Sequence, residues 1–116
     1  MYNTLIKKMK TIFEYTNVSA STRLESFTIK KLEKIFKQYP FVIRSDIFFR
    51  KENKSDQKGH ICGIQLSAPG PRIYASSDEK TFEGAISNTI DDLIDQLQKR
   101  KMKLYKSSQI KAFNKD

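Results

Sequence analysis

The sequence predicts an α+β fold: a two-layer sandwich, β-α-β-β-β-α, in which two helices pack on one face of a four-stranded sheet. Four segments have the apolar alternation of strands, two have the apolar period of helices, and turn residues separate them. The 116 residues suit one domain. We expect a flexible N-terminal arm at 1–10, the α+β domain at 11–104 and a basic C-terminal tail at 105–116.

The first strand is expected at 11–18, where the aromatic Phe13 and Tyr15 alternate with Ile12, Glu14 and Thr16. Three residues after it are candidate N-caps of a helix: Ser19, Ser21 and Thr22. Thr22 and Glu25 form a capping-box pattern. One apolar stripe predicts the buried side of this helix: Leu24, Phe27, Leu32, Ile35, Phe36 and Tyr39. Pro40 ends it.

Three more strands are expected, joined by turns. In segment 41–50, Arg44, Asp46, Phe48 and Arg50 alternate with Ile43, Ser45, Ile47 and Phe49 and predict a charged outer face. An exposed Phe48 could stack on a base, but packing beneath a loop is the more common role. Segment 51–59 reads as a hairpin loop, and 60–68 as a strand that buries Cys62, Ile64 and Leu66. The turn Pro69-Gly70-Pro71 precedes a fourth strand at 72–77.

This order predicts a mixed or antiparallel sheet, because hairpins join the last three strands. The first strand pairs with the second across a right-handed helical crossover, which places the two helices side by side.

The last helix is expected at 81–106. Its apolar stripe is Phe82, Ala85, Ile86, Ile90, Leu93, Leu97 and Leu104. Its acids come first and its bases last, an order that matches the helix macrodipole and is typical of a solvated helix end. Five cations within eight residues exceed that requirement and suit phosphate binding. The pattern of this helix leaves open whether its cations are a solvated helix end or a phosphate-binding surface.

The charge balance favours an anionic partner. Twenty-two Lys and Arg against thirteen Asp and Glu give a net charge of +9, and the pI is about 9.7. Nucleic acid, an acidic protein and an anionic membrane surface all fit. No apolar run approaches the ~20 residues of a membrane-spanning helix, and the N-terminus lacks the apolar core of a signal peptide. We therefore expect a cytoplasmic protein without membrane contact.

Residues for catalysis are scarce. Cys62 and His60 are the only residues of their types and are expected to be ordinary strand residues. Asp91, Asp92 and Asp95 could hold a hard cation, but acids in the first half of a helix are explained more simply by the macrodipole. Nucleotide-binding glycine loops are absent from the sequence. We expect no enzyme activity, no cofactor, no metal and no small-molecule substrate.

Several stretches carry a resemblance: NVSASTRLESF with KLEKIF, LSAPG before IYASSDEKTF, and AISNTIDDLIDQLQKRKMKL. They resemble the ribosome hibernation-promoting factor and ribosome-associated inhibitor family, of the short type. In the last stretch the family pattern falls on Ala85-Ile86, 91–93, Gln96-Leu97, and Lys99 with Lys101. The resemblance covers roughly 11–104, and the order and spacing of these positions carry it.

The resemblance implies the same fold, without the second, dimer-forming domain of long-type members. It also implies binding to the small ribosomal subunit and its rRNA, in single or paired ribosomes. The protein would cover the decoding region, where mRNA and tRNA lie, and would inhibit translation in stationary phase or stress. Off the ribosome we expect a monomer.

The basic helix faces and the outer face of the second strand supply the candidate RNA-binding residues: Arg23, Lys30, Lys34, Lys37, Arg44, Arg50, Lys99, Arg100, Lys101, Lys103 and Lys106.

Two departures from the family pattern bear on the site. Asp95 stands where the family commonly has a basic residue, which should weaken an RNA contact there, and the connection QYPFVIR is a few residues longer. Two other functions remain open: a general RNA-binding module or RNA chaperone that is not specific to the ribosome, and a regulatory domain whose basic face meets an acidic protein.

Overall fold

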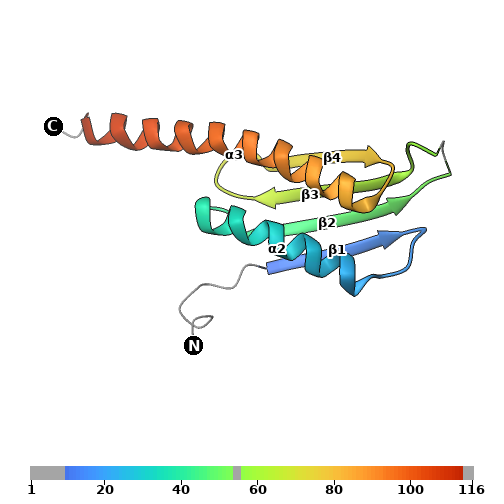
Figure 1. Ribbon diagram of the computed structural model, residues 1–116. Helices are drawn as coiled ribbons and strands as arrows, with labels where there is room; N and C mark the ends of the chain where they lie inside the picture. Colours follow the sequence, from blue (N-terminus) through green and yellow to red (C-terminus); the bar gives the residue numbers. More distant parts are fainter. Residues whose placement is uncertain (1–9, 54–55, 114–116) are drawn as a thin grey trace.

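The computed structural model describes residues 10–53 and 56–113, with side chains described up to residue 106. The elements in this part of the chain are β1 (Lys10–Thr16), α2 (Thr22–Gln38), β2 (Arg44–Lys51), β3 (His60–Ser67), β4 (Ile73–Glu79) and α3 (Phe82–Phe113). Both helices cover the same face of the sheet (Figure 1). The predicted two-layer α+β sandwich, β-α-β-β-β-α, is confirmed. The expected N-terminal arm lies, except for Lys10, outside the described residues.

The sheet is mixed, with its strands in the order β1-β2-β3-β4. β1 and β2 are parallel, with Phe13 opposite Ile47, whereas β2 with β3 and β3 with β4 are antiparallel. Parallel neighbours need a crossover connection, and α2 provides it. Antiparallel neighbours need only the two hairpins. Of the two sheet types that the sequence allowed, the mixed one is therefore correct.

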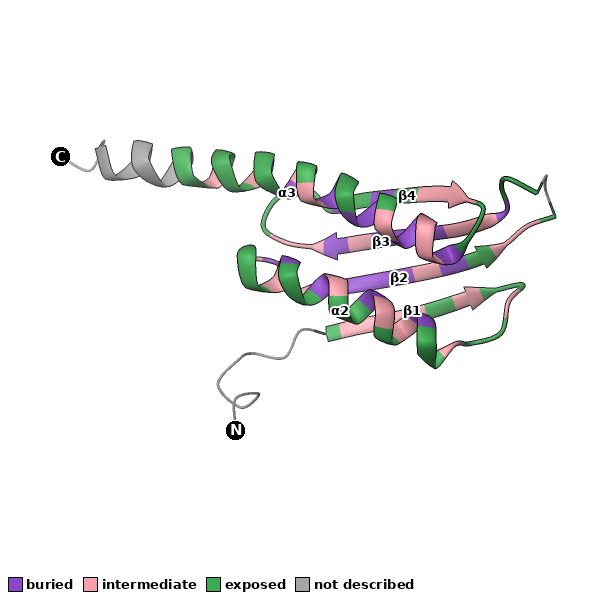
Figure 2. Cartoon of the chain, viewed as in Figure 1, coloured by how far each residue is buried: buried purple, intermediate pink, exposed green. Residues whose placement is uncertain are grey.

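The core lies between the helices and one face of the sheet. On β2, Ile47 and Phe49 point into it and are 0% and 1% exposed, respectively. The predicted apolar stripes and the inward face of β3 contribute most of the other buried residues: Leu24, Leu32, Ile35, Tyr39, Cys62, Ile64, Leu66, Phe82, Ala85, Ile86, Ile90, Leu93 and Leu97. In Figure 2 the buried residues lie on β2, β3, β4, α2 and the part of α3 above the sheet, β1 has none, and exposed residues dominate α3 beyond the sheet.

The start of α2 differs from the capping-box expectation. Ser21 is the N-cap, and its Oγ accepts a hydrogen bond from the Leu24 N–H at 3.2 Å. Thr22 is therefore already the first residue of the helix and does not form the predicted box with Glu25, whose carboxylate accepts a hydrogen bond of 2.8 Å from the Tyr15 hydroxyl. A tertiary contact to β1 has taken the place of the local one.

The end of α3 also differs from the prediction. Thr81 Oγ1 accepts a hydrogen bond from the Gly84 N–H at its start, and the helix continues to Phe113 instead of ending near 106. Leu104 is the last residue of the predicted stripe, but the segment after it contains no glycine or proline to end the helix. The backbone is therefore helical across the boundary expected between 104 and 105. Residues 114–116 of the expected tail lie outside the described residues.

The two helices run side by side in the same direction, as Figure 1 shows. At their starts, Arg23 forms an ion pair with Glu83, 60 residues away in sequence. Near the end of α2, the Tyr39 hydroxyl donates to Gln98 Oε1 at 3.0 Å, across 59 residues. Because the sequence separation is almost the same in both contacts, each turn of α2 lies beside the turn of α3 that comes about 60 residues later. The predicted adjacency of the two basic helices is confirmed.

Candidate nucleic-acid interface

The exposed side of α2 carries three cations. Lys30, Lys34 and Lys37 follow one another at helical spacing, opposite the buried stripe, and all three are exposed. None forms an ion pair with another described residue. By the spacing of the helix pair, Lys37 lies level with Leu97 of α3 and Lys30 level with Ile90. Lys37 is therefore the α2 lysine nearest to the basic end of α3.

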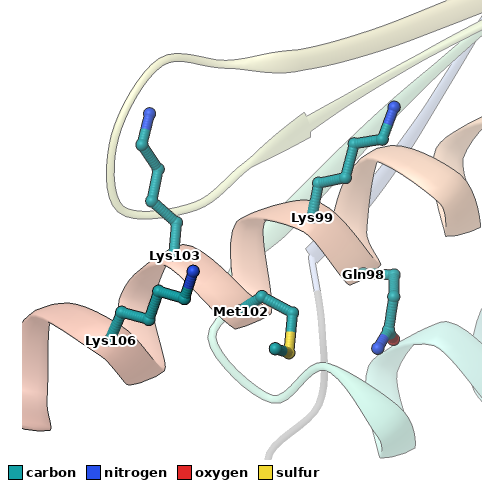
Figure 3. A pocket seen from close by; sticks show the side chains of 5 residues that line it. All are labelled: Gln98, Lys99, Met102, Lys103 and Lys106. Carbon is teal, nitrogen blue, oxygen red and sulfur yellow. The ribbon is translucent and has the colours of Figure 1, made fainter.

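The basic end of α3 contains a shallow hollow of about 460 Å³. It is lined by Gln98, Lys99, Met102, Lys103 and Lys106 (Figure 3). Lys99 and Lys103 extend to one side of the helix, whereas Gln98 and Met102 extend to the side of α2 (Figure 3). Met102 is 49% exposed, so a thioether surface lies among three ammonium groups. Ammonium groups on flexible stems can adapt to phosphates.

The first half of α3 is acidic on its exposed side. Asp91, Asp92 and Asp95 are exposed, and Asp92 Oδ1 accepts a hydrogen bond from Gln96 Nε2 at 3.0 Å. No group of three potential metal ligands occurs in the part of the chain that the structure describes. Among the described side chains, the cations of α3 begin at Lys99, level with the end of α2, and continue beyond it.

Two cations of the basic run are held by contacts within the chain. Arg100 donates from Nη1 to the Pro69 carbonyl at 2.6 Å and from Nη2 to the Pro71 carbonyl at 2.8 Å. Lys101 Nζ lies 5.7 Å from the centroid of the Tyr39 ring, within the range of a cation–π contact. Neither contact was predicted. The run KRKMK is therefore divided between cations with partners and the lysines of the hollow.

Arg23 is paired at the start of the helix layer. Its guanidinium donates to the Glu83 carboxylate. This guanidinium, together with a backbone hydrogen bond, holds the pKa of Glu83 below its ordinary value of 4.5. The pair is largely exposed, at 71% for the Arg23 side chain and 38% for Glu83. This ion pair neutralises Arg23, the only predicted RNA-binding residue in the first turn of α2.

Arg44 and Arg50 point to the open face of the sheet, away from the helices. Asp46, two residues from Arg44, accepts hydrogen bonds from the Arg44 Nε and Nη2 atoms at distances of 3.0 to 3.3 Å. This carboxylate raises the pKa of Arg44. Arg50 Nε donates to Glu52 at 2.9 Å. The structure therefore does not bring these two arginines together with the lysines of α2 and α3.

Sequence reasoning missed Gln98 and Met102 as residues of the hollow. Their spacing of four residues placed them on one side of the helix, but neither carries a charge, so a search for cations passed over them.

The single cysteine and histidine lie near the helix-covered face of the sheet. Burial raises the pKa of the Cys62 thiol to about 12, which keeps it protonated. The His60 ring packs edge-on against Phe82, with 4.8 Å between ring centroids. Its Nδ1 has no hydrogen-bond partner among the described residues. Neither residue faces the lysines. Along the described residues, no helix is long and apolar enough to cross a membrane.

Comparison with known proteins agrees with this fold. The crystal structure of the Thermus thermophilus Protein Y N-terminal domain superposes with a TM-score of 0.66 and 17% identity, over 78% of this chain and 96% of that chain. A ribosomal subunit interface protein from Coxiella burnetii gives a TM-score of 0.71 and 23% identity, over 81% of this chain and 99% of that chain. At these identities the likeness concerns the fold. A sequence search of curated proteins finds no match.

A family model adds evidence from sequence. The model described as "Sigma 54 modulation protein / S30EA ribosomal protein" matches residues 11–105, nearly the whole described domain. The resemblance seen in the sequence is thereby confirmed. This chain belongs to the sigma 54 modulation protein / S30EA ribosomal protein family, which includes the hibernation-promoting factors.

Proposed function

We propose that the protein is a ribosome hibernation factor that acts in the cytoplasm. It binds the small ribosomal subunit in the channel for mRNA and tRNA and inhibits translation in stationary phase or stress. Family membership supports a ribosomal partner, and the subunit interface named for the Coxiella burnetii protein supports the location.

One observation carries the proposal: the exposed sides of two parallel helices present lysines that have no ion pair with another described residue. They are Lys30, Lys34, Lys37, Lys99, Lys103 and Lys106. Such lysines bind phosphates as point charges and release counterions from the RNA. Because they contact the backbone, they select RNA shape and not base sequence. The rigid helix pair keeps them in place over a structured rRNA surface.

Sedimentation with purified small subunits over a range of salt concentrations tests the proposal. If the six lysines each contact one phosphate, the logarithm of the binding constant falls with the logarithm of salt with a slope of about 4 to 5. Initiator tRNA and mRNA should displace the protein, and added protein should inhibit translation in a reconstituted system. Absent or salt-insensitive binding would contradict the proposal.

A general RNA-binding module is the second candidate, because the same lysines contain no feature that is specific to the ribosome. Competition separates the two functions. A general module binds free duplex or single-stranded RNA as tightly as subunits, and tRNA on the subunit does not displace it. A hibernation factor prefers the empty channel.

A further inference from the structure

Arg100 stands in the middle of the basic run but is only partly exposed, unlike Lys99 and Lys103. Its guanidinium makes two hydrogen bonds to carbonyls of the turn between β3 and β4, at 2.6 Å to Pro69 and 2.8 Å to Pro71. One planar fork thus spans the two carbonyls that flank Gly70. A phosphate would have to compete with both of these bonds.

The turn is shaped to receive this guanidinium. Gly70 has φ +96°, a conformation that favours glycine. A Cβ at this position would lie 3.0 Å from Arg100 Nη1 and 3.3 Å from Cζ. The glycine therefore allows both the backbone conformation and the close approach of the side chain from α3.

Arg100 also occupies a defined place along α3. One turn earlier, Gln96 Nε2 donates to the Tyr74 carbonyl of β4 at 2.9 Å. Gln96 and Arg100 are four residues apart, so they lie on the same side of the helix and together attach it to β4 and the turn. Further along, Met102 and Tyr105 are 49% and 59% exposed. Arg100 thus attaches α3 to the turn between β3 and β4 just before the largely exposed part of the helix.

We propose that Arg100 is a positioning residue: it locks the Pro69-Gly70-Pro71 turn to α3 and thereby holds Lys99 and Lys103 in place for RNA phosphates. Lys99 precedes it directly, and Lys103 follows it by nearly one helical turn on the same side. With the lock in place, the basic end of α3 keeps one orientation relative to the domain. Without it, that orientation has to be ordered when RNA binds, at a cost in affinity. This inference rests on the proposed function.

The alternative is that Arg100 is itself a phosphate contact, and Arg100→Lys separates the two roles. The substitution keeps the positive charge but replaces a planar fork by an ammonium group, which cannot reproduce the two bonds to the turn. A phosphate contact tolerates this change because lysine also binds phosphate. A lock does not.

The experiment measures binding of the full chain to purified small subunits as a function of salt. For Arg100→Lys we expect binding about five- to tenfold weaker, with an unchanged salt slope. Gly70→Ala should have a similar effect, because its methyl group displaces the same guanidinium. Lys103→Ala is the contrasting variant and should lower the slope by about 0.7 to 0.9, the value for one lost phosphate contact. Thermal unfolding above the assay temperature confirms that each variant is folded.

Two results would overturn the inference. One is wild-type binding by Arg100→Lys together with a reduced slope for Arg100→Ala, which would identify a phosphate contact. The other is wild-type binding by Arg100→Lys and also by Arg100→Ala. If the wild-type chain does not bind subunits, the proposed function fails and this role of Arg100 fails with it. Amide exchange in residues 68–73 tests the lock in the absence of RNA. Faster exchange in Arg100→Lys than in the wild type would show that Arg100 holds the turn even if the proposed function fails.

Discussion

The helix layer and the open face of the sheet both carry cations, but they use them differently. On the helix layer, Lys34, Lys37 and Lys99 are exposed and have no ion pair with another described residue. On the open face, Arg44 and Arg50 each bond to a carboxylate two residues away. The lysines of the helix layer are therefore available to a partner, whereas the arginines of the open face pair within the chain.

The difference follows from the chemistry of the two side chains. A guanidinium presents a planar fork of donors that matches carboxylates and pairs of carbonyls, whereas an ammonium is a strongly hydrated point charge. All four arginines predicted to bind RNA have acceptors within the chain: Arg23, Arg44, Arg50 and Arg100. A count of basic residues therefore overestimates the surface available to RNA.

The largest expected effect comes from reversing the lysines at the shared end of the two helices. Lys37, Lys99, Lys103 and Lys106 all changed to Glu should weaken subunit binding about a thousandfold, from ~1 kcal/mol per lost contact. The salt slope should fall by about 3. Sedimentation measures both quantities. Circular dichroism must show a folded protein; retained binding by a folded variant would break the contrast between the two surfaces.

Asp95→Lys should have the opposite effect, because it adds a cation to the helix layer and should therefore strengthen subunit binding. Asp95 is exposed one helical turn before Lys99, so a lysine there extends the free cations of α3. We expect binding about fivefold tighter and a salt slope larger by about 0.7 to 0.9. Asp91→Lys is the matched control, with the same charge change one turn further from the hollow. Equal gains in both variants would indicate general attraction instead of a local contact.

The arginines of the open face should matter little for binding. For the double variant Arg44→Ala, Arg50→Ala we expect less than a twofold change in subunit affinity. Its stability should fall, however, by about 1 to 3 kcal/mol, because Asp46, 9% exposed, loses its hydrogen-bond donor. Urea unfolding and sedimentation separate the two effects. A clear loss of affinity together with a lower salt slope would show that the open face is a second contact surface.

The smallest expected effect is a pH-dependent one at the start of the helix pair. The Arg23 guanidinium lowers the pKa of Glu83, so the pair stabilises the fold above the ordinary value of 4.5 and stops doing so as pH falls through the lowered pKa. For this exposed pair we expect a few tenths of a kcal/mol, about 0.3. Urea unfolding of Glu83→Gln should differ from wild type near neutral pH and converge with it in acid. A difference that grows in acid would contradict this assignment.

The sequence was sufficient for the elements and their order. Apolar period and turn residues located the four strands and two helices that the described residues form, because each pattern is local. The boundaries were less accurate: β2 starts at Arg44 instead of 41, and α3 continues to Phe113. Ser21 and not Thr22 is the cap of α2, and Glu25 accepts a hydrogen bond from Tyr15 of β1, a contact that no local pattern could reveal.

The candidate site was predictable in part. The pair of Arg44 with Asp46 could have been read from sequence, because residues two apart on a strand share a face. Glu52, the partner of Arg50, lies just past the end of β2. The partner of Arg23 lies 60 residues away, and those of Arg100 lie 31 and 29 residues away. Only the folded chain brings those groups within reach.

The sequence by itself determined the fold class, the family and the basic character of both helices, since these depend on local patterns and on the order of motifs. The tertiary structure decided which cations are available to a partner, because a charge is satisfied by whatever acceptor the fold places beside it. For the lysines of α2 and of the hollow, the described residues place none there.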